Sequence, residues 1–246
     1  FDSKILIDET VNKGTNKDPI LYYESKVYTG KIFDVWTNGN KRIIKTIKDG
    51  KEKGEFKTWY SNGQIEKQGQ ILNNKKDASY KQWFKDGQIE YDINYKNGEF
   101  NGSYKQWFKN GQILVDKNYK NGDLHGSYKQ WFNDGQLEYD KNYKKGELDG
   151  EYLEYRKISI GFLRWEMTFK NGKEDGLRRL WSNNDLLEEG QYVMGKENGL
   201  HRKAWRHSTY DHFTPDRYIL CYYQNGEKHG EYKKFDEKII EAGKYI

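Results

Sequence analysis

The sequence has 246 residues, with 43 Lys and Arg against 38 Asp and Glu, 25 Gly, 21 Tyr, 8 Trp and 11 Phe but only 2 Pro and 1 Cys. A single cysteine excludes an internal disulfide and a cysteine-based zinc site, and no stretch reaches the 18 apolar residues that a membrane-spanning helix needs. The two signs of charge are interspersed and leave a net charge of +5, which argues against the basic stripe of a nucleic-acid-binding protein.

Residues 1–29 are predicted to form an N-terminal capping unit. They contain the apolar runs Ile5-Leu6-Ile7 and Ile20-Leu21-Tyr22-Tyr23 but not the pattern that follows, and repeat arrays commonly end in such atypical units. The chain starts at Phe1 without a methionine or a positively charged leader, as a mature or trimmed chain does. We therefore expect a cytoplasmic protein or, if a leader was removed, an exported or cell-envelope protein.

A repeat of 24 residues organises residues 30–150. Its copies at residues 79–102, 103–126 and 127–150 are nearly identical. A glycine precedes each repeat, with Ala78 in the one place where it is missing. Fixed internal periods of this length are the signature of repeat architectures, and we predict regular repeats throughout this region.

Each repeat is predicted to contain two strands and two turns. The first turn is Asn-Gly or Asp-Gly, as at Asn110-Gly111, which is typical of a two-residue type I′ hairpin. The second connection, as at residues 97–102, contains two glycines and is expected to be a wider link between hairpins. Counting outward from the first turn pairs Phe108 with Ile113, Trp107 with Leu114, Gln106 with Val115, Lys105 with Asp116 and Tyr104 with Lys117.

Side chains alternate between the two faces of a strand. The face predicted to form the core carries Tyr104, Gln106, Phe108, Ile113, Val115 and Tyr119. The opposite face is predicted to carry Lys105, Trp107, Lys109, Gln112 and Asp116. In the neighbouring repeats the same register opposes Lys81 to Asp92 and Lys129 to Asp140, and each such pair favours this register by about 0.2 to 1 kcal/mol.

Residues 151–229 are irregular, and residues 230–246 are predicted to form a C-terminal half unit. The surplus of the longest repeat, between Gly199 and Gly230, falls at a hairpin tip from Arg206 to Arg217. Insertions of this kind are where repeat arrays tend to carry function.

These elements predict an all-β fold, an elongated single-layer antiparallel sheet of successive β-hairpins. About eight to nine repeats would occupy residues 30–246. An open sheet of more than about ten strands does not stay flat, and we therefore expect it to twist or curl into a trough.

The repeat resembles the MORN repeat, and specifically the variant found in bacterial proteins. The matching positions include Gly102, Tyr104, Trp107, Phe108, Asn110, Gly111, Tyr119, Asn121, Gly122 and Gly126. The resemblance covers about residues 30–246 and implies an elongated, curved sheet of hairpins. It also implies a link to toxin–antitoxin systems, because bacterial members are often labelled antitoxin components. Eukaryotic relatives act as scaffolds or bind membranes and protein partners.

A column of tryptophans is the most distinct candidate surface. Each lies five residues after its repeat glycine, and the column comprises Trp59, Trp83, Trp107, Trp131 and Trp181. The lysines beside it are Lys81, Lys105 and Lys129. Two interpretations stay open: the column is a track that binds a partner, or it is a second buried ladder covered by lysine stems. A bulge between Tyr and Trp would place both on one face.

The hairpin tip is the second candidate contact region. Its candidate residues are Arg206, His207, Tyr210, His212, Phe213 and Arg217. A metal site would need three or four ligands to converge, and the histidines here have no ligand spacing. No Ser-His-Asp arrangement, phosphate-binding glycine loop or nucleophile elbow occurs. We therefore expect no enzyme, metal, cofactor or small-molecule substrate.

Our primary hypothesis is a non-enzymatic module that binds another protein and neutralises a toxin or effector, as an antitoxin or immunity protein does. The alternative is a membrane-associated or cell-surface scaffold or adhesion protein. Anionic lipids attract clusters of four to eight Lys and Arg, whereas pairs such as Lys75-Lys76 and Arg178-Arg179 are scattered among acidic residues. We expect a protein partner, with membrane lipid as a further partner under the alternative, and no nucleic acid.

Overall fold

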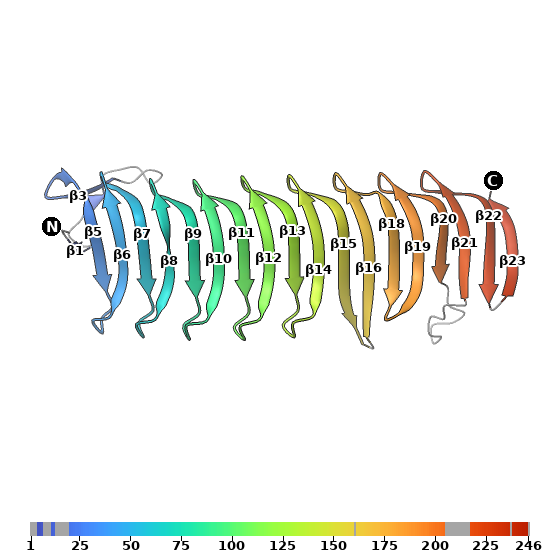
Figure 1. Cartoon of the computed structure of the whole chain (residues 1–246), viewed down its shortest axis with the longest axis horizontal. Helices are drawn as coiled ribbons and strands as arrows, with labels where there is room; N and C mark the ends of the chain where they lie inside the picture. Colours follow the sequence, from blue (N-terminus) through green and yellow to red (C-terminus); the bar gives the residue numbers. More distant parts are fainter. Residues whose placement is uncertain are drawn as a thin grey trace. The chain divides into compact units, whose positions relative to one another are not determined.

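The computed structural model describes residues 4–6, 11–12, 20–159, 161–204, 217–236 and 238–245. The chain divides into two compact units. Unit 1 comprises residues 1–123 and 133–135, and unit 2 comprises residues 124–132 and 136–246. Strands following one another as antiparallel hairpins make up both units (Figure 1). Within the described ranges there is no helix that could span a membrane.

Unit 1 is built on eight consecutive antiparallel strands. They are β5 (Gly30–Val35), β6 (Lys41–Lys48), β7 (Lys51–Trp59), β8 (Ile65–Leu72), β9 (Lys75–Trp83), β10 (Ile89–Lys96), β11 (Glu99–Trp107) and β12 (Ile113–Lys120), each paired with the next. β1 (Lys4–Leu6) pairs in parallel with β5. β2 (Val11–Asn12), β3 (Leu21–Tyr23) and β4 (Lys26–Val27) form a small separate sheet.

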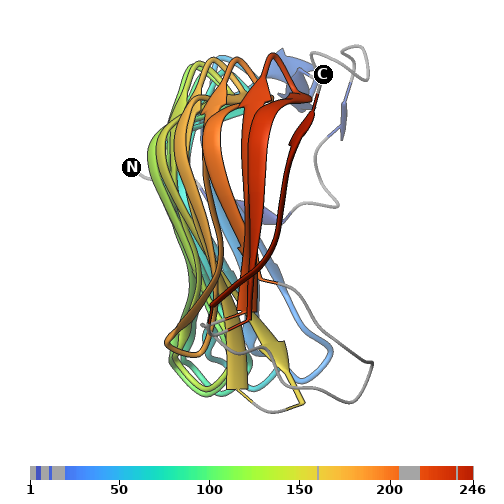
Figure 2. The same ribbon diagram turned by 90° about the vertical axis from the view of Figure 1, so that its right-hand side faces the viewer.

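Unit 2 continues the same pattern with longer and less regular strands. They are β13 (Asp123–Trp131), β14 (Leu137–Lys144), β15 (Glu147–Ile158), β16 (Gly161–Lys170), β17 (Lys173–Glu174), β18 (Gly176–Ser182), β19 (Asp185–Val193), β20 (Lys196–Ala204), β21 (Arg217–Gln224), β22 (Glu227–Asp236) and β23 (Lys238–Tyr245). β16 pairs with both β17 and β18. The strands of unit 2 bend along their length instead of lying flat (Figure 2), in keeping with the twist of β-sheets.

The predicted all-β architecture of successive antiparallel hairpins is confirmed. The predicted division into a cap, regular repeats, irregular repeats and a half unit stays a prediction. Of the hairpin-tip residues proposed as contacts, Arg206, His207, Tyr210, His212 and Phe213 lie outside the described residues.

The two connections of each repeat have exchanged roles relative to the prediction. The connection predicted to be wide is the tight turn, and the tip predicted to be a two-residue turn is the longer loop. At Asn97-Gly98 both residues have positive φ, +54° and +91°, and Lys96 pairs with Glu99, which makes this connection the two-residue type I′ turn. At the hairpin tip, Phe108 N–H donates to the Gln112 carbonyl (2.8 Å) and Gly111 N–H to the Phe108 carbonyl (2.9 Å). The tip is therefore a three-residue loop that ends in a left-handed glycine, Gly111 with φ +83°.

The residue before the tip glycine has a different role from the one predicted for it. Asn110 does not have positive φ, and its Oδ1 accepts a hydrogen bond from Gln112 N–H (3.0 Å). Side chains of Asn and Asp form such local turns readily. The Asn-Gly and Asp-Gly tips are thus selected by this hydrogen bond and by the glycine, and not by two positive φ angles.

The three-residue loop changes the predicted pairing near the tip. Trp107 pairs with Ile113, and a register shift follows before Gln106 pairs with Val115. The predicted pairs of Phe108 with Ile113 and of Trp107 with Leu114 are therefore wrong, because the longer loop moves one extra residue into the returning strand as a bulge. Ile113 consequently lies opposite Trp107 and not on the predicted core face. From Gln106 toward the start of the strand, the predicted pairs are confirmed.

A second bulge lies at the glycine that precedes each repeat. Gly102 has φ +101°, and the register between β10 and β11 shifts beside it. Ala78 adopts φ +58° at the equivalent position. The glycine column therefore marks a bulge in a continuous strand, which corrects the expectation of a wide link between hairpins.

One face of each unit, here called the aromatic face, is where the core lies. In unit 1 it buries Phe56, Tyr80 and Ile93, and further aromatic side chains pack against this cluster. The Lys76 ammonium lies 3.7 Å from the centre of the Tyr80 ring, and burial lowers the pKa of Lys76. The prediction that Val115 belongs to the core is confirmed, because this side chain is buried.

Two glycines on the aromatic face are required by close packing. A Cβ on Gly69 would lie 2.9 Å from the Phe56 ring, and a Cβ on Gly190 would overlap the ring of His201. In the equivalent returning strands β12 and β14, Lys117 and Lys141 stand at this position, with their ammonium groups 4.4 Å from the Tyr104 ring and 4.8 Å from the Tyr152 ring. The same core position is thus filled by a ring over glycine, by a lysine stem between rings or, at Ile93 and Met167, by an apolar side chain.

Candidate functional site

The opposite face, here called the charged face, carries a ladder of alternating charges in unit 1. Lys81 Nζ lies 2.9 Å from Asp92 Oδ2, and Lys105 Nζ lies 2.7 Å from Asp116 Oδ2. The register also opposes Asp92 to Lys105, so that each aspartate lies next to a lysine. The predicted cross-strand pairs are confirmed here, although exposed pairs of this kind stabilise the fold by no more than about 1 kcal/mol each.

In unit 1 a tryptophan ends the first strand of each of three successive repeats. Trp59, Trp83 and Trp107 are the last residues of β7, β9 and β11, and all are partly buried. Each pairs with an isoleucine at the start of the returning strand. The tip aromatic residue of one repeat reaches the next tryptophan: the Trp36 indole N–H donates to the Trp59 carbonyl (2.9 Å) and the Tyr60 hydroxyl to the Trp83 carbonyl (2.7 Å). The role of this column as a partner contact stays a prediction.

In unit 2 the charged face begins with the regular pattern and then departs from it. Lys129 Nζ lies 2.8 Å from Asp140 Oδ2, and Trp131 ends β13. The next lysine position is occupied by Leu153, which pairs with Asp140 on one side and Glu166 on the other. Further along, Arg179 pairs with Glu189 (Nε to Oε2, 2.5 Å).

The last tryptophan of the predicted column is also placed on this face. Trp181 is partly buried in β18 and pairs with Arg164, whose guanidinium lies 4.9 Å from the centre of the indole ring. Arg217, the one described member of the predicted tip contacts, lies in β21 and pairs with Asp236 (Nε to Oδ1, 2.8 Å). It is therefore part of the strand pairing between β21 and β22.

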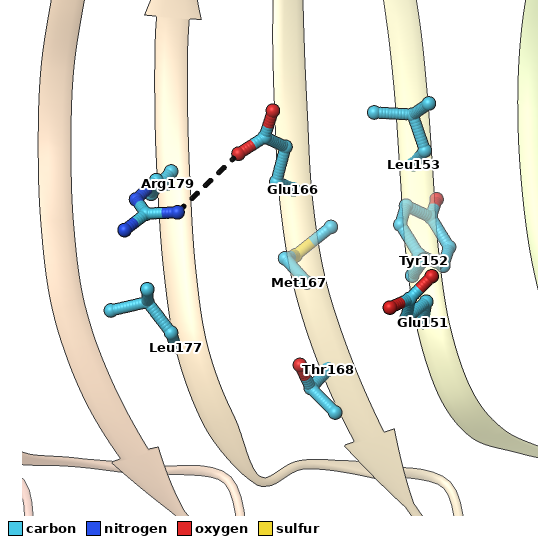
Figure 3. A pocket seen from close by; sticks show the side chains of 8 residues that line it. All are labelled: Glu151, Tyr152, Leu153, Glu166, Met167, Thr168, Leu177 and Arg179. Carbon is cyan, nitrogen blue, oxygen red and sulfur yellow. Dashed lines mark ion pairs between the residues drawn. The ribbon is translucent and has the colours of Figure 1, made fainter.

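The departure from the pattern in unit 2 coincides with a hollow of about 340 Å³. Its walls come from β15, β16 and β18 (Figure 3). The side chains of the charged face that line it are Glu151, Leu153, Glu166, Thr168, Leu177 and Arg179. The sequence reasoning did not identify these residues. The available signal was the replacement of the repeated Ser and Lys, as at Ser127 and Lys129, by Glu151 and Leu153.

A second hollow, of about 270 Å³, lies nearer the hairpin tips of unit 2. It is lined by Gln136, Leu137, Tyr155 and Phe162. Tyr155 stands five residues after Gly150, the position that the tryptophan column occupies in other repeats. Leu153 and Tyr155 belong to the same strand, so both hollows border β15.

The aromatic face of unit 2 contains a buried polar cluster around His201. This side chain is fully buried, with Nε2 2.8 Å from the Gln191 carbonyl oxygen and Nδ1 3.9 Å from Glu197 Oε1. Lys203 donates to the same Glu197 oxygen (2.6 Å). Burial raises the pKa of Tyr192, whose ring packs against His201, to about 12.

The cluster does not supply a metal site within the described part of the chain, where no three His, Cys, Asp or Glu side chains converge to hold an ion. Cys221, which pairs with His201, is buried as a free thiol. The immediate partners of His201 are the rings of Tyr192 and Tyr223 and the Gln191 carbonyl, an arrangement that packs the core.

Comparison with known families identifies the repeat. A family model described as MORN repeat variant matches residues 52–73, 76–97, 100–121 and 124–145. Each match begins two residues after a type I′ turn glycine or its equivalent and ends in the next turn. The chain therefore carries four MORN repeat variants between residues 52 and 145, which confirms the resemblance there. The prediction of about eight to nine repeats over residues 30–246 stays a prediction. A comparison with curated proteins finds no match. Repeats of this kind indicate a repeat-based binding module.

Proposed function

We propose that this chain, which carries four MORN repeat variants, is a non-enzymatic module that binds another protein through its charged face. Binding would neutralise a toxin or effector by covering its working surface, as an antitoxin or immunity protein does. The single observation that carries the proposal is the recurrence of the same lysine, aspartate and tryptophan positions on one face of successive hairpins.

The exposure of the ladder supports contact with a partner. The side chains of Lys81, Asp92 and Lys105 keep 42%, 32% and 41% of their surface exposed. Charges arranged in this way contribute to the rate and specificity of association, and half-buried tryptophans beside them are the residue type that most often contributes binding energy. A partner whose own charges alternate would therefore be selected over one with a uniform charge.

The experiment is affinity capture from the source cells with three forms of the chain. The wild type is compared with Lys81→Glu/Lys105→Glu, which reverses two charges on the charged face, and with Lys96→Glu, an exposed lysine beside a type I′ turn. We expect the wild type and Lys96→Glu to retain one specific protein and the double variant to lose it. A double variant that folds, by circular dichroism, and still retains the partner would overturn the charged face as the binding surface.

Neutralisation is tested separately with the captured protein. Cells that produce the captured protein alone should stop growing. Co-production of the wild-type MORN repeat chain should restore growth. A captured protein that is harmless to the cells would contradict neutralisation and leave protein binding intact.

A membrane-associated or cell-surface scaffold is the second candidate, and one observation favours it. The type I′ turn edge of unit 2 carries exposed lysines, which are Lys144, Lys145, Lys170, Lys173 and Lys196. Met194, at the same edge, is 53% exposed. A cluster of four to eight basic residues attracts anionic lipid. Sedimentation with phosphatidylserine vesicles should retain the chain only at low salt, and equal sedimentation with neutral vesicles would exclude this mode.

A further inference from the structure

We propose that the hollow bordered by Glu151, Leu153 and Leu177 binds an extended segment of a partner protein in which an apolar residue and a lysine or arginine lie two positions apart. The inference rests on the proposed protein-binding function and places a specific contact within unit 2. It concerns the hairpin in which this chain departs from its own repeat.

The hollow lies where a leucine replaces the lysine of the regular repeats. Three residues after the repeat glycine, the regular repeats carry Lys81, Lys105 and Lys129, each bonded to an aspartate on the returning strand. At the same position in β15, Leu153 pairs with Glu166 and forms no ion pair, since its side chain ends in methyl groups. Its shorter side chain leaves the space that a lysine stem would fill.

The wall of the hollow on β18 is also apolar. Leu177 stands one residue after its repeat glycine, where the regular repeats have Ser79, Ser103 and Ser127. It lines the hollow together with Leu153 on the far side of β16 (Figure 3). Leu177 lies diagonally across β16 from Leu153 (Figure 3), because Glu166 pairs with Leu153 on one side and with Arg179 on the other. Two leucine side chains that line one hollow favour an apolar occupant, because burying it removes apolar surface from water.

The charges around the hollow leave one carboxylate without a counterion. Glu166 is compensated by Arg164 (3.1 Å) and Arg179 (3.9 Å), and Arg179 is compensated further by Glu189. Glu151 is exposed, and no ion pair joins it to any residue that the structure describes. The uncompensated charge beside the apolar walls is therefore negative, which selects an occupant with a cationic group.

The spacing of the two features identifies an extended segment. Glu151 and Leu153 are two positions apart on one face of β15, which corresponds to about 6.6 Å. An extended segment repeats its side chains on one side at the same interval. An apolar residue seated against Leu153 would thus place a lysine or arginine two positions along beside Glu151. The volume of about 340 Å³ is at the lower end of the range for ligand sites, about 300 to 1,000 Å³.

The direct test is a methyl nuclear magnetic resonance titration of the whole chain with labelled leucines. The probe is a capped peptide, Gly-Ser-Leu-Ser-Lys-Ser-Gly, and the control peptide has glutamate in place of lysine. We expect the lysine peptide to shift the methyl signals of Leu153 and Leu177, and the glutamate peptide to require at least about a tenfold higher concentration for the same shift. Equal responses to the two peptides, or no response at these methyls, would overturn the proposal.

A variant pair separates the site from the fold. Leu153→Lys introduces the residue that the regular repeats carry, so the hairpin should fold, and Lys should occupy the hollow and reduce affinity for the lysine peptide by at least about tenfold. Lys120→Leu, at an exposed lysine beside a type I′ turn and outside the proposed binding surfaces, is the matched control and should leave peptide binding unchanged. Retained binding by a folded Leu153→Lys protein, read from the Leu177 methyls, would contradict the assignment.

The outcomes also distinguish this inference from the proposed function. If Leu153→Lys still binds the peptide while Lys81→Glu/Lys105→Glu loses the captured partner, the proposed binding site in the hollow is wrong and the proposed function of the charged face stands. If the double variant retains its partner while the peptide response requires Leu153, the hollow stands and the proposed role of the ladder fails.

Discussion

Units 1 and 2 share their type I′ turns but fill the two faces differently, and some hairpin tips of unit 2 are two-residue turns in which Ile158 pairs with Gly161 and Ser182 with Asp185. On the aromatic face, unit 1 buries Phe56, Tyr80 and Ile93, whereas unit 2 buries His201 among tyrosines. On the charged face, unit 1 repeats Lys–Asp pairs, whereas unit 2 replaces one lysine with Leu153 and opens a hollow. The two regions share a backbone and differ in chemistry.

This difference shows that the residues that determine the backbone of the repeat are not the residues that line its two faces. Asn97-Gly98 in unit 1 and Met194-Gly195 in unit 2 have nearly the same pairs of positive φ angles, +54° and +91° against +52° and +85°. Methionine has none of the local hydrogen bonds that favour asparagine in this conformation. The turn is thus held by its glycine and by the flanking ladder, and side chains on the faces are free to diverge toward a ligand.

The largest expected effect compares the two close-packed glycines. Gly190→Ala should lower the free energy of unfolding by about 3 kcal/mol, because the added methyl overlaps a fully buried histidine ring. Gly69→Ala should cost less, about 1 to 2 kcal/mol, because its neighbour is the edge of the Phe56 ring at 2.9 Å. Urea denaturation measures both.

The control for this comparison is Gly126→Ala. Gly126 has φ +83° and nothing within 4 Å of an added Cβ, so the variant reports the backbone conformation alone, at about 1 kcal/mol. If Gly190→Ala lowers the free energy of unfolding by no more than this control does, the close packing of His201 against Gly190 does not determine the stability of unit 2.

Alkaline unfolding provides a second comparison of the units. Burial raises the pKa of Tyr80 in unit 1 and of Tyr192 in unit 2 to about 12, against about 10 in an unfolded chain. Between pH 10 and 12 the unfolded chain therefore holds fewer protons, and the free energy of unfolding falls as the pH rises, with its full value below pH 10. Urea denaturation across this range should show a shallower fall for Tyr80→Phe and for Tyr192→Phe. A slope unchanged in both variants would contradict these pKa shifts.

A reciprocal exchange tests whether the turns of the two units are equivalent. Met194→Asn should raise the free energy of unfolding by about 0.5 to 1 kcal/mol, and Asn97→Met should lower it by a similar amount, because asparagine tolerates the left-handed conformation better. Thermal or urea unfolding of the two variants measures the exchange. Changes of the same sign in both would mean that the surrounding contacts, and not the backbone angles, decide the preference.

The smallest effects are expected from the ion pairs of the charged face. A double-mutant cycle on Lys105 and Asp116 should give a coupling energy below about 1 kcal/mol, because both side chains are partly exposed. The cycle on Arg179 and Glu189 should give a similar value that also falls with salt. A coupling energy well above this range in unit 1 alone would show that the ladder is a stabilising network instead of a surface available to a partner.

The sequence was sufficient for the hairpins, their order and the pairing of Lys105 with Asp116, because a 24-residue period and alternating side chains constrain all three. It was not sufficient for the turns. Both connections contain Asn-Gly, and glycine suits a type I′ turn and a three-residue loop equally well. The tip register therefore depended on Phe108, which follows the last residue of β11 and lies opposite Gln112 and not Ile113.

The candidate site was predictable only in part. The tryptophan and lysine columns recur in the sequence, and the structure places them on one face of each unit. The hollow depends on the length of one side chain at Leu153 and on the pairing of Arg164, Arg179 and Glu166 across strands. These are three-dimensional relations that a single sequence does not report.

The bulges at Ala78 and Gly102 have a consequence for how such a gene can change. Both residues adopt a left-handed backbone and each is followed by the same Ser-Tyr-Lys-Gln-Trp-Phe sequence. Recombination between the two copies would remove residues 79–102 and join Ala78 to Ser103, recreating the original junction residue for residue. The gene can therefore gain or lose a whole hairpin without disturbing a register, and the length of the binding surface becomes a heritable variable.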